Sequence, residues 1–313
     1  MRKSILVIGS SNTDMIIKSE RFPDPGETIL GGDLYMLPGG KGANQAVAAA
    51  RLGGEVSFIC RVGDDLFGKR SIQVYEEERI STDNIIVDPK ERSGVALISV
   101  NGDGENKIVV ASGANNGFKE EEIENVYKII SRSDYVIMQL EIPVSIVGKI
   151  IQFSKQTDTN IILNPAPAQK LPDWFFEDLF LVTPNETETE ILTGINVSDE
   201  LTAKKAALWF QNKGVRNVVI TLGKNGSYLV TSNEAYAIST PNVNTIDSTA
   251  AGDVFNGALA VALANGQSFK EAVNFASIAA ALSVKKIGAQ SSCPTLEDVW
   301  AFSQTLVERN YQF

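Results

Sequence analysis

The chain has 313 residues, 43% of them hydrophobic and 21% charged, which is enough for one large globular domain with a substantial core. Its net charge of −10 argues against a partner such as nucleic acid, because a phosphate backbone needs a basic face. The chain has no histidine and two well-separated cysteines, so histidine triads, imidazole metal sites and a disulfide framework are all disfavoured. Acid–base chemistry must therefore come from Asp, Glu, Lys, Tyr or Cys.

The first predicted element is a strand over residues 5–8, a continuous apolar run typical of a parallel strand buried on both faces. This run is too short for a signal peptide, and the longest apolar run, residues 258–264, is too short to cross a bilayer. We therefore expect a cytoplasmic protein with no membrane partner. Residues 9–14 lack the GxGxxG fingerprint, which argues against a nicotinamide-dependent dehydrogenase.

Two polar residues, Asn12 and Asp14, follow this strand at alternate positions, so both side chains can face the same way. Ligands bind outside the carboxyl ends of the strands in open α/β sheets, which makes both residues candidates for substrate binding. An ordinary Asx turn explains them equally well.

A glycine-rich segment, residues 39–46, opens a predicted helix over residues 43–52. It is not a Walker loop, which needs the pattern GxxxxGK[ST]. Close backbone approach at Gly39 and Gly40, with Lys41 and Asn44 at the helix start, could hold the hydroxyls of a sugar. A glycine-rich turn before a capped helix remains an equal interpretation.

Two strands, at 93–100 and 107–112, flank an Asn-Gly-Asp-Gly turn and form a predicted hairpin. With the irregular β-like residues 14–36, they predict a small separate sheet that acts as a lid or a dimer surface. The rest of the chain alternates between strand and helix, which predicts a mainly parallel sheet with right-handed crossovers. We expect strands over 55–62, 134–140, 160–163, 179–182 and 217–222, and helices over 65–80, 120–131, 143–155, 199–213, 254–264 and 269–286.

Polar or glycine residues follow most of these strands, at Glu141, at 183–188 and at 223–226, and their convergence at one sheet edge predicts a catalytic crevice. The most informative segment is 247–253, Asp-Ser-Thr-Ala-Ala-Gly-Asp, which precedes the helix at 254–264. Small residues and a helix N-terminus favour a bound phosphate. Asp253 could then be a general base, but from this stretch alone an acidic N-cap is the favoured interpretation.

Residues 39–46 and 247–257 together resemble the two signatures of the PfkB family of sugar kinases. Residues 185–188 and 221–223 match further elements of that family in the same order, and the resemblance runs from residues 12–14 to 288–290. It implies one kinase domain over residues 1–313. The implied fold is a Rossmann-like α/β/α three-layer sandwich with a mainly parallel sheet and a small β-sheet lid, built from about 14–36 and 93–112. A homodimer through that lid is also implied.

The resemblance implies a role for each matching residue. Asp253 is similar to the catalytic base, and the backbone N–H groups of Ala250, Ala251, Gly252 and Asp253 to the anion hole for the transferred phosphate. The residues that match the sugar-binding positions are Asn12, Asp14, Gly40, Lys41, Gly42, Ala43, Asn44, Glu141 and Asp253. The residues that match the nucleotide-binding positions are Asn185, Thr221, Leu222, Gly223, Lys224, Asn225, Gly226, Gly252 and Ser277.

Two cations are implied in the same way, besides ATP. Asn185 and Glu188 match an element associated with Mg²⁺. A K⁺ site would use mainly backbone carbonyls of Asp247, Thr249, Ser283, Lys286, Gly288 and Ser292. Two departures are visible: Ser248 stands where relatives often have threonine, and Ser277 stands where some have a histidine near the adenine.

The activity that the resemblance implies is ATP-dependent phosphorylation of D-ribose at O5. Other acceptors stay open, namely 2-deoxyribose, fructose or a nucleoside such as adenosine. A non-catalytic sugar-binding regulator on the same fold is a further alternative. Asp253 together with residues 250–252 argues against it, because a binding protein has no use for the base.

Overall fold

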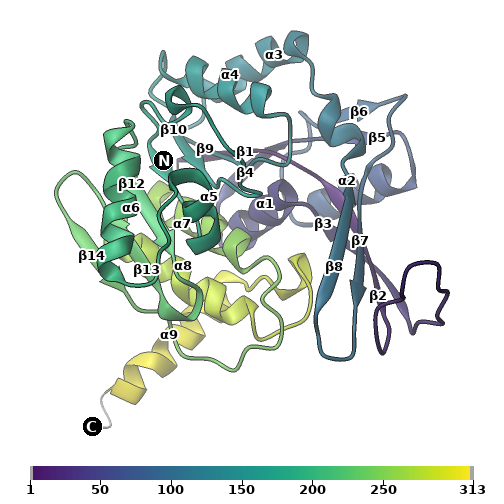
Figure 1. Cartoon of the computed structure of the whole chain (residues 1–313). Coiled ribbons are helices and arrows are strands. Elements are labelled where there is room, and N and C mark those ends of the chain that lie inside the picture. The colour runs from purple at the N-terminus through teal and green to yellow at the C-terminus, as the bar shows by residue number, and fades with distance from the viewer. Residues whose placement is uncertain (1–2, 311–313) are drawn as a thin grey trace.

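The computed structural model describes residues 3–310 and is built around one large sheet. Within these residues that sheet has eight strands in the order β14-β13-β12-β11-β10-β9-β1-β4 (Figure 1). Six neighbouring strands are parallel: β1 (Ser4–Ile8), β4 (Glu55–Ile59), β9 (Tyr135–Met138), β10 (Asn160–Leu163), β11 (Leu181–Val182) and β12 (Asn217–Thr221). An antiparallel hairpin of β13 (Ser227–Val230) and β14 (Ala235–Ile238) continues the sheet at one edge.

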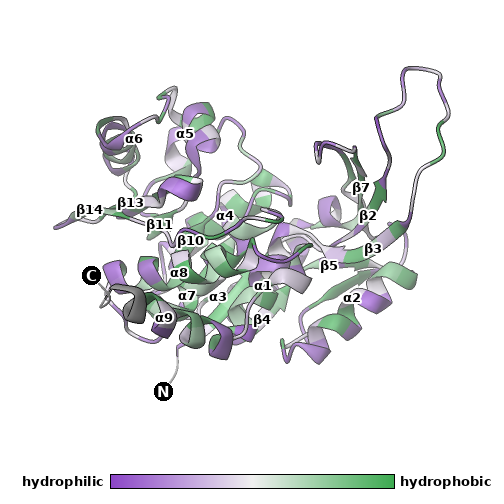
Figure 2. Ribbon diagram, turned by 90° about the horizontal axis from the view of Figure 1, so that it is seen from below, coloured by the Kyte–Doolittle hydropathy of each residue, from purple (hydrophilic) through white to green (hydrophobic). Residues whose placement is uncertain are grey.

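Helices cover both faces of this sheet because its strands are apolar on both sides. One core cluster lies under α1 (Lys41–Arg51), α2 (Leu66–Glu77), α7 (Ala251–Ala264), α8 (Phe269–Ser283) and α9 (Leu296–Asn310). A second cluster lies under α3 (Glu120–Ile130), α4 (Val144–Ser154), α5 (Glu186–Thr193) and α6 (Glu200–Asn212). Figure 2 shows the hydrophobic residues concentrated between the helices and the sheet. The predicted three-layer α/β/α class is confirmed.

Helix α7 is deeply enclosed, with every residue from Asp253 to Ala264 buried. Its small residues let it pack closely on α1: a Cβ added at Gly257 would lie 2.7 Å from the Cβ of Ala48. Such tight packing leaves little room for either helix to shift. The two helices that begin at the predicted site are therefore held in one fixed relation.

A separate four-stranded sheet stands beside the main body, in the order β3-β2-β7-β8. Its strands are β2 (Asn12–Lys18), β3 (Leu34–Gly39), β7 (Gly94–Val100) and β8 (Asn106–Ala111), and β2 pairs with β7 in parallel. The loop of residues 19–33 between β2 and β3 reaches away from the body (Figure 1). The predicted small sheet is confirmed, whereas its action as a lid stays a prediction, as does the single domain over 1–313. Residues 1–2 and 311–313 of that domain lie outside the described residues.

Several predicted elements need correction. The strand predicted over 55–62 is two strands, because the chain turns at Cys60 and β5 (Arg61–Gly63) pairs with β6 (Ile86–Asp88) in a small sheet of its own. The helix predicted over 254–264 begins three residues earlier, at Ala251. The hairpin of β13 and β14 and the helices α5 and α9 were not predicted. Within the described residues, no helix is long and apolar enough to cross a membrane.

Candidate active site

The N-terminus of α7 is the centre of the candidate site. Its N-cap, Ala250, has a left-handed backbone with φ of 59°, which is uncommon for a residue with a side chain. Strain of this kind persists only where the surrounding structure imposes it, and it is concentrated at functional sites. A Cβ added at Gly252 would meet nothing within 4 Å, so space remains beside this turn. The amide of Ala251, one of the predicted anion-binding groups, donates to the carbonyl of Ser248 at 3.2 Å.

Asp253 is the third residue of α7, and its side chain does not cap the helix. It is only 5% exposed and accepts two hydrogen bonds from α1, from Asn44 Nδ2 to Oδ2 at 3.0 Å and from Gln45 Nε2 to Oδ1 at 2.9 Å. The N-cap interpretation that the segment alone favoured is therefore wrong. Burial raises the pKa of Asp253, while Lys41 and the two amides lower it, and burial prevails.

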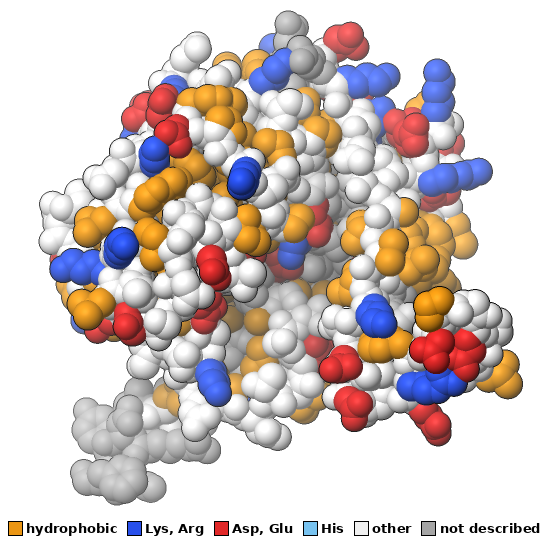
Figure 3. Space-filling view, in the orientation of Figure 1, with side chains coloured by type: hydrophobic (Ala, Val, Ile, Leu, Met, Phe, Trp, Pro, Cys, Tyr) orange, Lys and Arg blue, Asp and Glu red, His pale blue; other side chains and the backbone are white. Residues whose placement is uncertain are grey.

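Lys41 lies at the start of α1, directly after Gly40, whose φ of 89° requires glycine. The pKa of Lys41 is raised: burial lowers it, but Asp253, Glu141, Glu188 and Asp14 together outweigh that effect. The ammonium group is therefore charged at neutral pH and interacts electrostatically with all four carboxylates. Figure 3 shows a hollow between the main body and the small sheet, with acidic and basic side chains inside it.

Glu141 is held by two donors. Its Oε2 accepts from the hydroxyl of Ser10 at 2.6 Å and from the backbone amide of Lys41 at 3.0 Å. Asp14, on β2, has a pKa raised to about 6, first by burial and then by Glu141 and Asp253. Glu141, from the main body, and Asp14, from the small sheet, therefore interact electrostatically.

A cavity of about 330 Å³ is lined by Asn12, Glu141 and the unpredicted Asn115, among others. Asn115 is fully buried, and its Nδ2 donates to Asn12 Oδ1 at 2.7 Å, which fixes the predicted sugar contact. Gly42 and Ala43 do not face this space. They are buried against Ser10, to which both backbone amides donate, and their predicted contact with a sugar stays a prediction.

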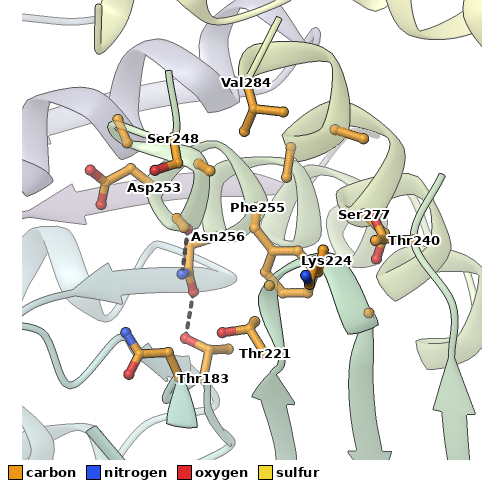
Figure 4. Close-up of a pocket in the computed structure, with 18 of the residues that line it drawn as sticks. Thr183, Thr221, Lys224, Thr240, Ser248, Asp253, Phe255, Asn256, Ser277 and Val284 are labelled. Carbon is orange, nitrogen blue, oxygen red and sulfur yellow. Dashed lines mark hydrogen bonds between the residues drawn. The ribbon is translucent and has the colours of Figure 1, made fainter. Parts of the chain in front are cut away.

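A larger cavity, of about 840 Å³, is lined by Asp253 (Figure 4). Most of the predicted nucleotide-binding residues line it: Asn185, Thr221, Gly223, Lys224, Asn225, Gly226, Gly252 and Ser277. Leu222 is the exception, since it packs against the second core cluster. Both Lys41 and Asp253 line this cavity and not the smaller one, which Asn12 and Glu141 line.

Residues that were not predicted complete the wall. The segment containing Thr240, Asn242 and Thr245 lines the larger cavity, as does Phe255. Asn256 bridges two elements: its Oδ1 accepts from Thr183 Oγ1 at 2.6 Å, and its Nδ2 donates to the carbonyl of Gly252 at 2.8 Å (Figure 4). A polar residue three positions after Asp253 in an otherwise apolar helix is a signal that could have revealed it.

Asn185 and Glu188 form a reciprocal capping box at the start of α5. Asn185 Oδ1 accepts from the amide of Glu188 at 2.8 Å, and Glu188 Oε2 accepts from the amide of Asn185 at 2.9 Å. Burial raises the pKa of Glu188. Both residues line the larger cavity, so the cap also presents their polar atoms to it.

The residues predicted to hold K⁺ come from two segments that Asp247 joins. Its Oδ2 accepts from the amide of Gly288 at 2.8 Å, and its Oδ1 from the amide of Thr249 at 2.9 Å. The hydroxyls of Ser283 and Ser292 donate to nearby carbonyls, whereas Lys286 is exposed and donates its amide to the carbonyl of Ser283. Among the side chains that the structure describes, no group of three or more Cys, Asp or Glu is arranged to hold a metal ion.

An α/β/α body, a small separate sheet and a buried carboxylate in the wall of the larger cavity together fit a sugar kinase. A family model described as pfkB family carbohydrate kinase matches residues 2–296, and the chain belongs to this family. It is 45% identical over 302 residues to a ribokinase of Haemophilus influenzae, covering 96% of this chain and 99% of that protein.

Two further relatives bear on the substrate. A deoxyribokinase of Salmonella typhi is 36% identical over 296 residues, which cover 94% of this chain and 96% of the relative. A solved structure of an Arabidopsis thaliana ribokinase complexed with ribose and ATP superposes with a TM-score of 0.91 at 32% identity, covering 96% of this chain and 98% of that one. The predicted family and the predicted kinase class are therefore confirmed.

Proposed function

We propose that the chain catalyses ATP-dependent phosphorylation of D-ribose at O5 to give D-ribose 5-phosphate. The observation that carries this proposal is the place of Asp253, a buried carboxylate in the first turn of α7 that lines the larger, nucleotide-sized cavity. The ribokinase relatives support the same activity.

In this mechanism Asp253 accepts the proton of the ribose O5 hydroxyl as that oxygen attacks the γ-phosphorus of ATP. The backbone N–H groups of residues 250–253 and the positive end of α7 stabilise the charge on the transferred phosphoryl group. Lys41, charged and lining the larger cavity, adds a further positive charge there. Asn12, Asp14 and Glu141 hold the other sugar hydroxyls.

Mg²⁺ and a monovalent cation are part of the proposal. A bound Mg²⁺ would neutralise phosphate charge, and it keeps several waters, so Asn185 and Glu188 need to reach it only through water. Their donor set fits: each uses one side-chain oxygen for the cap, and both line the larger cavity. Asp247, Thr249, Ser283, Gly288 and Ser292 offer the oxygen ligands that K⁺ requires, on two segments already in contact.

The nearest alternative acceptor is 2-deoxyribose, which the deoxyribokinase relative supports. Ribose is favoured because Asn12, Asn115 and Glu141 supply several fixed polar groups in the smaller cavity. A site binds an analogue that lacks a hydroxyl much more weakly, because the polar groups that would pair with that hydroxyl remain buried and unpaired.

We also infer a homodimer through the small sheet and a cytoplasmic location. Exposed apolar side chains support the first inference, because Met36, Leu97 and Val109 lie in one cross-strand row of that sheet. Figure 3 shows hydrophobic side chains gathered over this part of the molecule. The two free cysteines, both buried, fit a reducing compartment.

A coupled assay of ADP release tests the activity, with ribose, 2-deoxyribose, fructose and adenosine compared at equal concentrations. We expect the highest kcat/KM with ribose. A higher value with 2-deoxyribose would assign the chain to that sugar instead. No ADP release with any of the four acceptors would favour a non-catalytic sugar-binding protein.

A further inference from the structure

Three buried amide side chains are linked to Asp253 by a chain of hydrogen bonds, and one of them, Asn164, also lines the larger cavity. Gln45, on α1, and Gln139, directly after β9, have no exposed surface, and Asn164, directly after β10, is 6% exposed. None of the three was predicted from the sequence. They connect the helix that begins at the glycine-rich loop to the carboxyl ends of two central strands.

The hydrogen bonds among these amides have a fixed direction. An ionised Asp253 can only accept, so Gln45 must turn its Nε2 towards Oδ1, at 2.9 Å. The same Nε2 donates to Asn164 Oδ1 at 3.0 Å. Gln45 Oε1 is then left as an acceptor, and Gln139 Nε2 donates to it at 2.6 Å. The whole chain of bonds is therefore set by the charge on one carboxylate.

A second branch runs from Asn164 back to α7. Its Nδ2 approaches the carbonyl of Thr183 at 3.4 Å, and Thr183 Oγ1 donates to Asn256 Oδ1 at 2.6 Å. Asn256 in turn donates to the carbonyl of Gly252 at 2.8 Å (Figure 4). The network thus holds both the side chain of the proposed base and the backbone of the turn before it.

We propose that Gln45 is a positioning residue for phosphoryl transfer, which orients the Asp253 carboxylate and sets its basicity, and that Gln139 holds Gln45 in place. This inference rests on the proposed function. It adds a residue that touches neither sugar nor nucleotide and acts only through Asp253.

The hydrogen bonding of the Gln139 amide supports a functional rather than a purely stabilising role. Its Oε1 is buried and has no hydrogen-bond partner within the described part of the chain. A buried polar atom without a partner is destabilising, and an apolar side chain in its place would avoid that effect. The presence of an amide rather than an apolar side chain at Gln139 is explained if its Nε2 is needed to orient Gln45.

The decisive experiment replaces Gln45 by methionine, Gln45→Met, which keeps the length of the side chain and removes its donor. We expect kcat with ribose and ATP to fall about tenfold, with the KM for ribose changed less than twofold, because a charge-assisted hydrogen bond to the base is lost. Donation to the ionised form lowers a pKa, so its loss raises the pKa of Asp253. The acid limb of the kcat/KM profile should then move to higher pH, by about one unit.

Asn217→Leu is the matched control. Asn217 is 8% exposed at the amino end of β12, and its Nδ2 donates to the carbonyl of Phe180 at 2.8 Å. The substitution removes a comparable buried amide at the opposite end of the strands. The melting temperature of this variant should fall, while the acid limb of its kcat/KM profile stays at the wild-type pH.

Gln139→Met is the second variant, because it leaves both donors to Asp253 in place and loosens only Gln45. We expect the acid limb of its kcat/KM profile to shift in the same direction but by less. If Gln45→Met does not fold, this variant tests whether Gln45 orients Asp253. An acid limb unmoved in the folded variants, with only a lower melting temperature, would overturn the inference. A wild-type protein that phosphorylates none of the sugars would instead refute the proposed function.

Discussion

Lys41 interacts electrostatically with four carboxylates, so negative charge is in excess around it. Asp253, Glu141, Glu188 and Asp14 each raise its pKa, while it lowers the pKa of Asp253. Excess negative charge is unfavourable for binding ATP unless a cation accompanies the nucleotide. The site is therefore one in which Lys41 and Mg²⁺ together would balance the acidic groups and the phosphates.

Replacing Asp253 by asparagine removes the proposed base while keeping its shape. We expect kcat to fall by about 10²–10⁴-fold, the usual contribution of a general base. Ribose binding, measured by calorimetry, should stay within a few fold, because Asn44 and Glu141 are unchanged. A variant with wild-type turnover would remove Asp253 as the base.

Asp14 should make the protein less stable as the pH rises. Its pKa is about 6 in the folded chain against an ordinary value of 3.8, so the folded state keeps the proton over that interval while the unfolded state loses it. The unfolding free energy then falls between pH 4 and pH 6 and stays lower above that. The shift corresponds to at most about 3 kcal/mol, at about 1.36 kcal/mol per unit.

Asp14→Asn should therefore raise the unfolding free energy at pH 7.5, and the gain should shrink towards pH 4. Urea unfolding at both pH values measures it. The same variant should raise the KM for ribose, since one proposed hydroxyl partner is altered. A gain that is equal at both pH values would show that charge burial is not its cause.

At the scale of elements, the contact between α1 and α7 fixes the site, because α7 carries Asp253 and α1 carries its two donors. Gly257 lets the helices approach: an added Cβ would lie 2.7 Å from Ala48 Cβ and 2.8 Å from the carbonyl of Gln45. Gly257→Ala should lower the unfolding free energy by about 1–3 kcal/mol, as overpacking does. It should also lower kcat, because the donors move away from the carboxylate.

Gly252→Ala is the control for the helix itself, since a Cβ there meets nothing within 4 Å. Denaturant unfolding should show no loss of stability in that variant. If Gly257→Ala is as stable and as active as wild type, the close helix contact is not what holds the site.

The two loops joined by Asp247 give a prediction about salt. A monovalent cation bound there would hold the loop whose amides, in the proposed mechanism, stabilise the phosphoryl group. Activity should rise when KCl replaces choline chloride at constant ionic strength, and Asp247→Ala should lose this increment. A flat response in the wild-type protein would dismiss the monovalent site.

The elements that could be predicted are those whose structural environment produces a recognisable pattern in the local sequence. Residues 5–8 and 160–163 are continuous apolar runs because both faces of those strands are covered. The hairpin of β13 and β14 was missed because residues 231–234 lack the Asn-Gly or Asp-Gly signal. Helix α5 was missed although Asn185 and Glu188 show the capping-box spacing, because its few apolar residues give no helical period.

The residues of the candidate site also divide into those that a local sequence pattern predicts and those that it does not. Asp253, Lys41 and Glu141 belong to segments with recognisable patterns, and the structure brings them together. Gln45, Gln139 and Asn115 could not be predicted, because whether a polar side chain turns inward depends on packing between distant segments. Leu222 shows the converse, since it lies inside a binding segment but turns to the core.

At the scale of the whole molecule, the small sheet leaves apolar surface uncovered. Met15, on β2, pairs with Met36 on one side and Leu97 on the other, and Leu97 pairs with Val109. This row faces away from Asp14, because neighbouring residues of a strand point to opposite faces. Met36, Leu97 and Val109 are 59%, 55% and 68% exposed. An apolar sheet face of this kind marks an interaction surface.

We expect the wild-type chain to sediment as a dimer and the double variant Leu97→Lys, Val109→Lys to sediment as a monomer, because two charges would have to be buried in each half of the interface. Leu201→Lys, at a 78% exposed position on α6, is the control and should leave the dimer intact. Sedimentation velocity at several concentrations distinguishes these states. If the small sheet also closes over the sugar, the monomeric variant should show a higher KM for ribose. A wild-type monomer, or a double variant that still sediments as a dimer, would contradict assembly through this face.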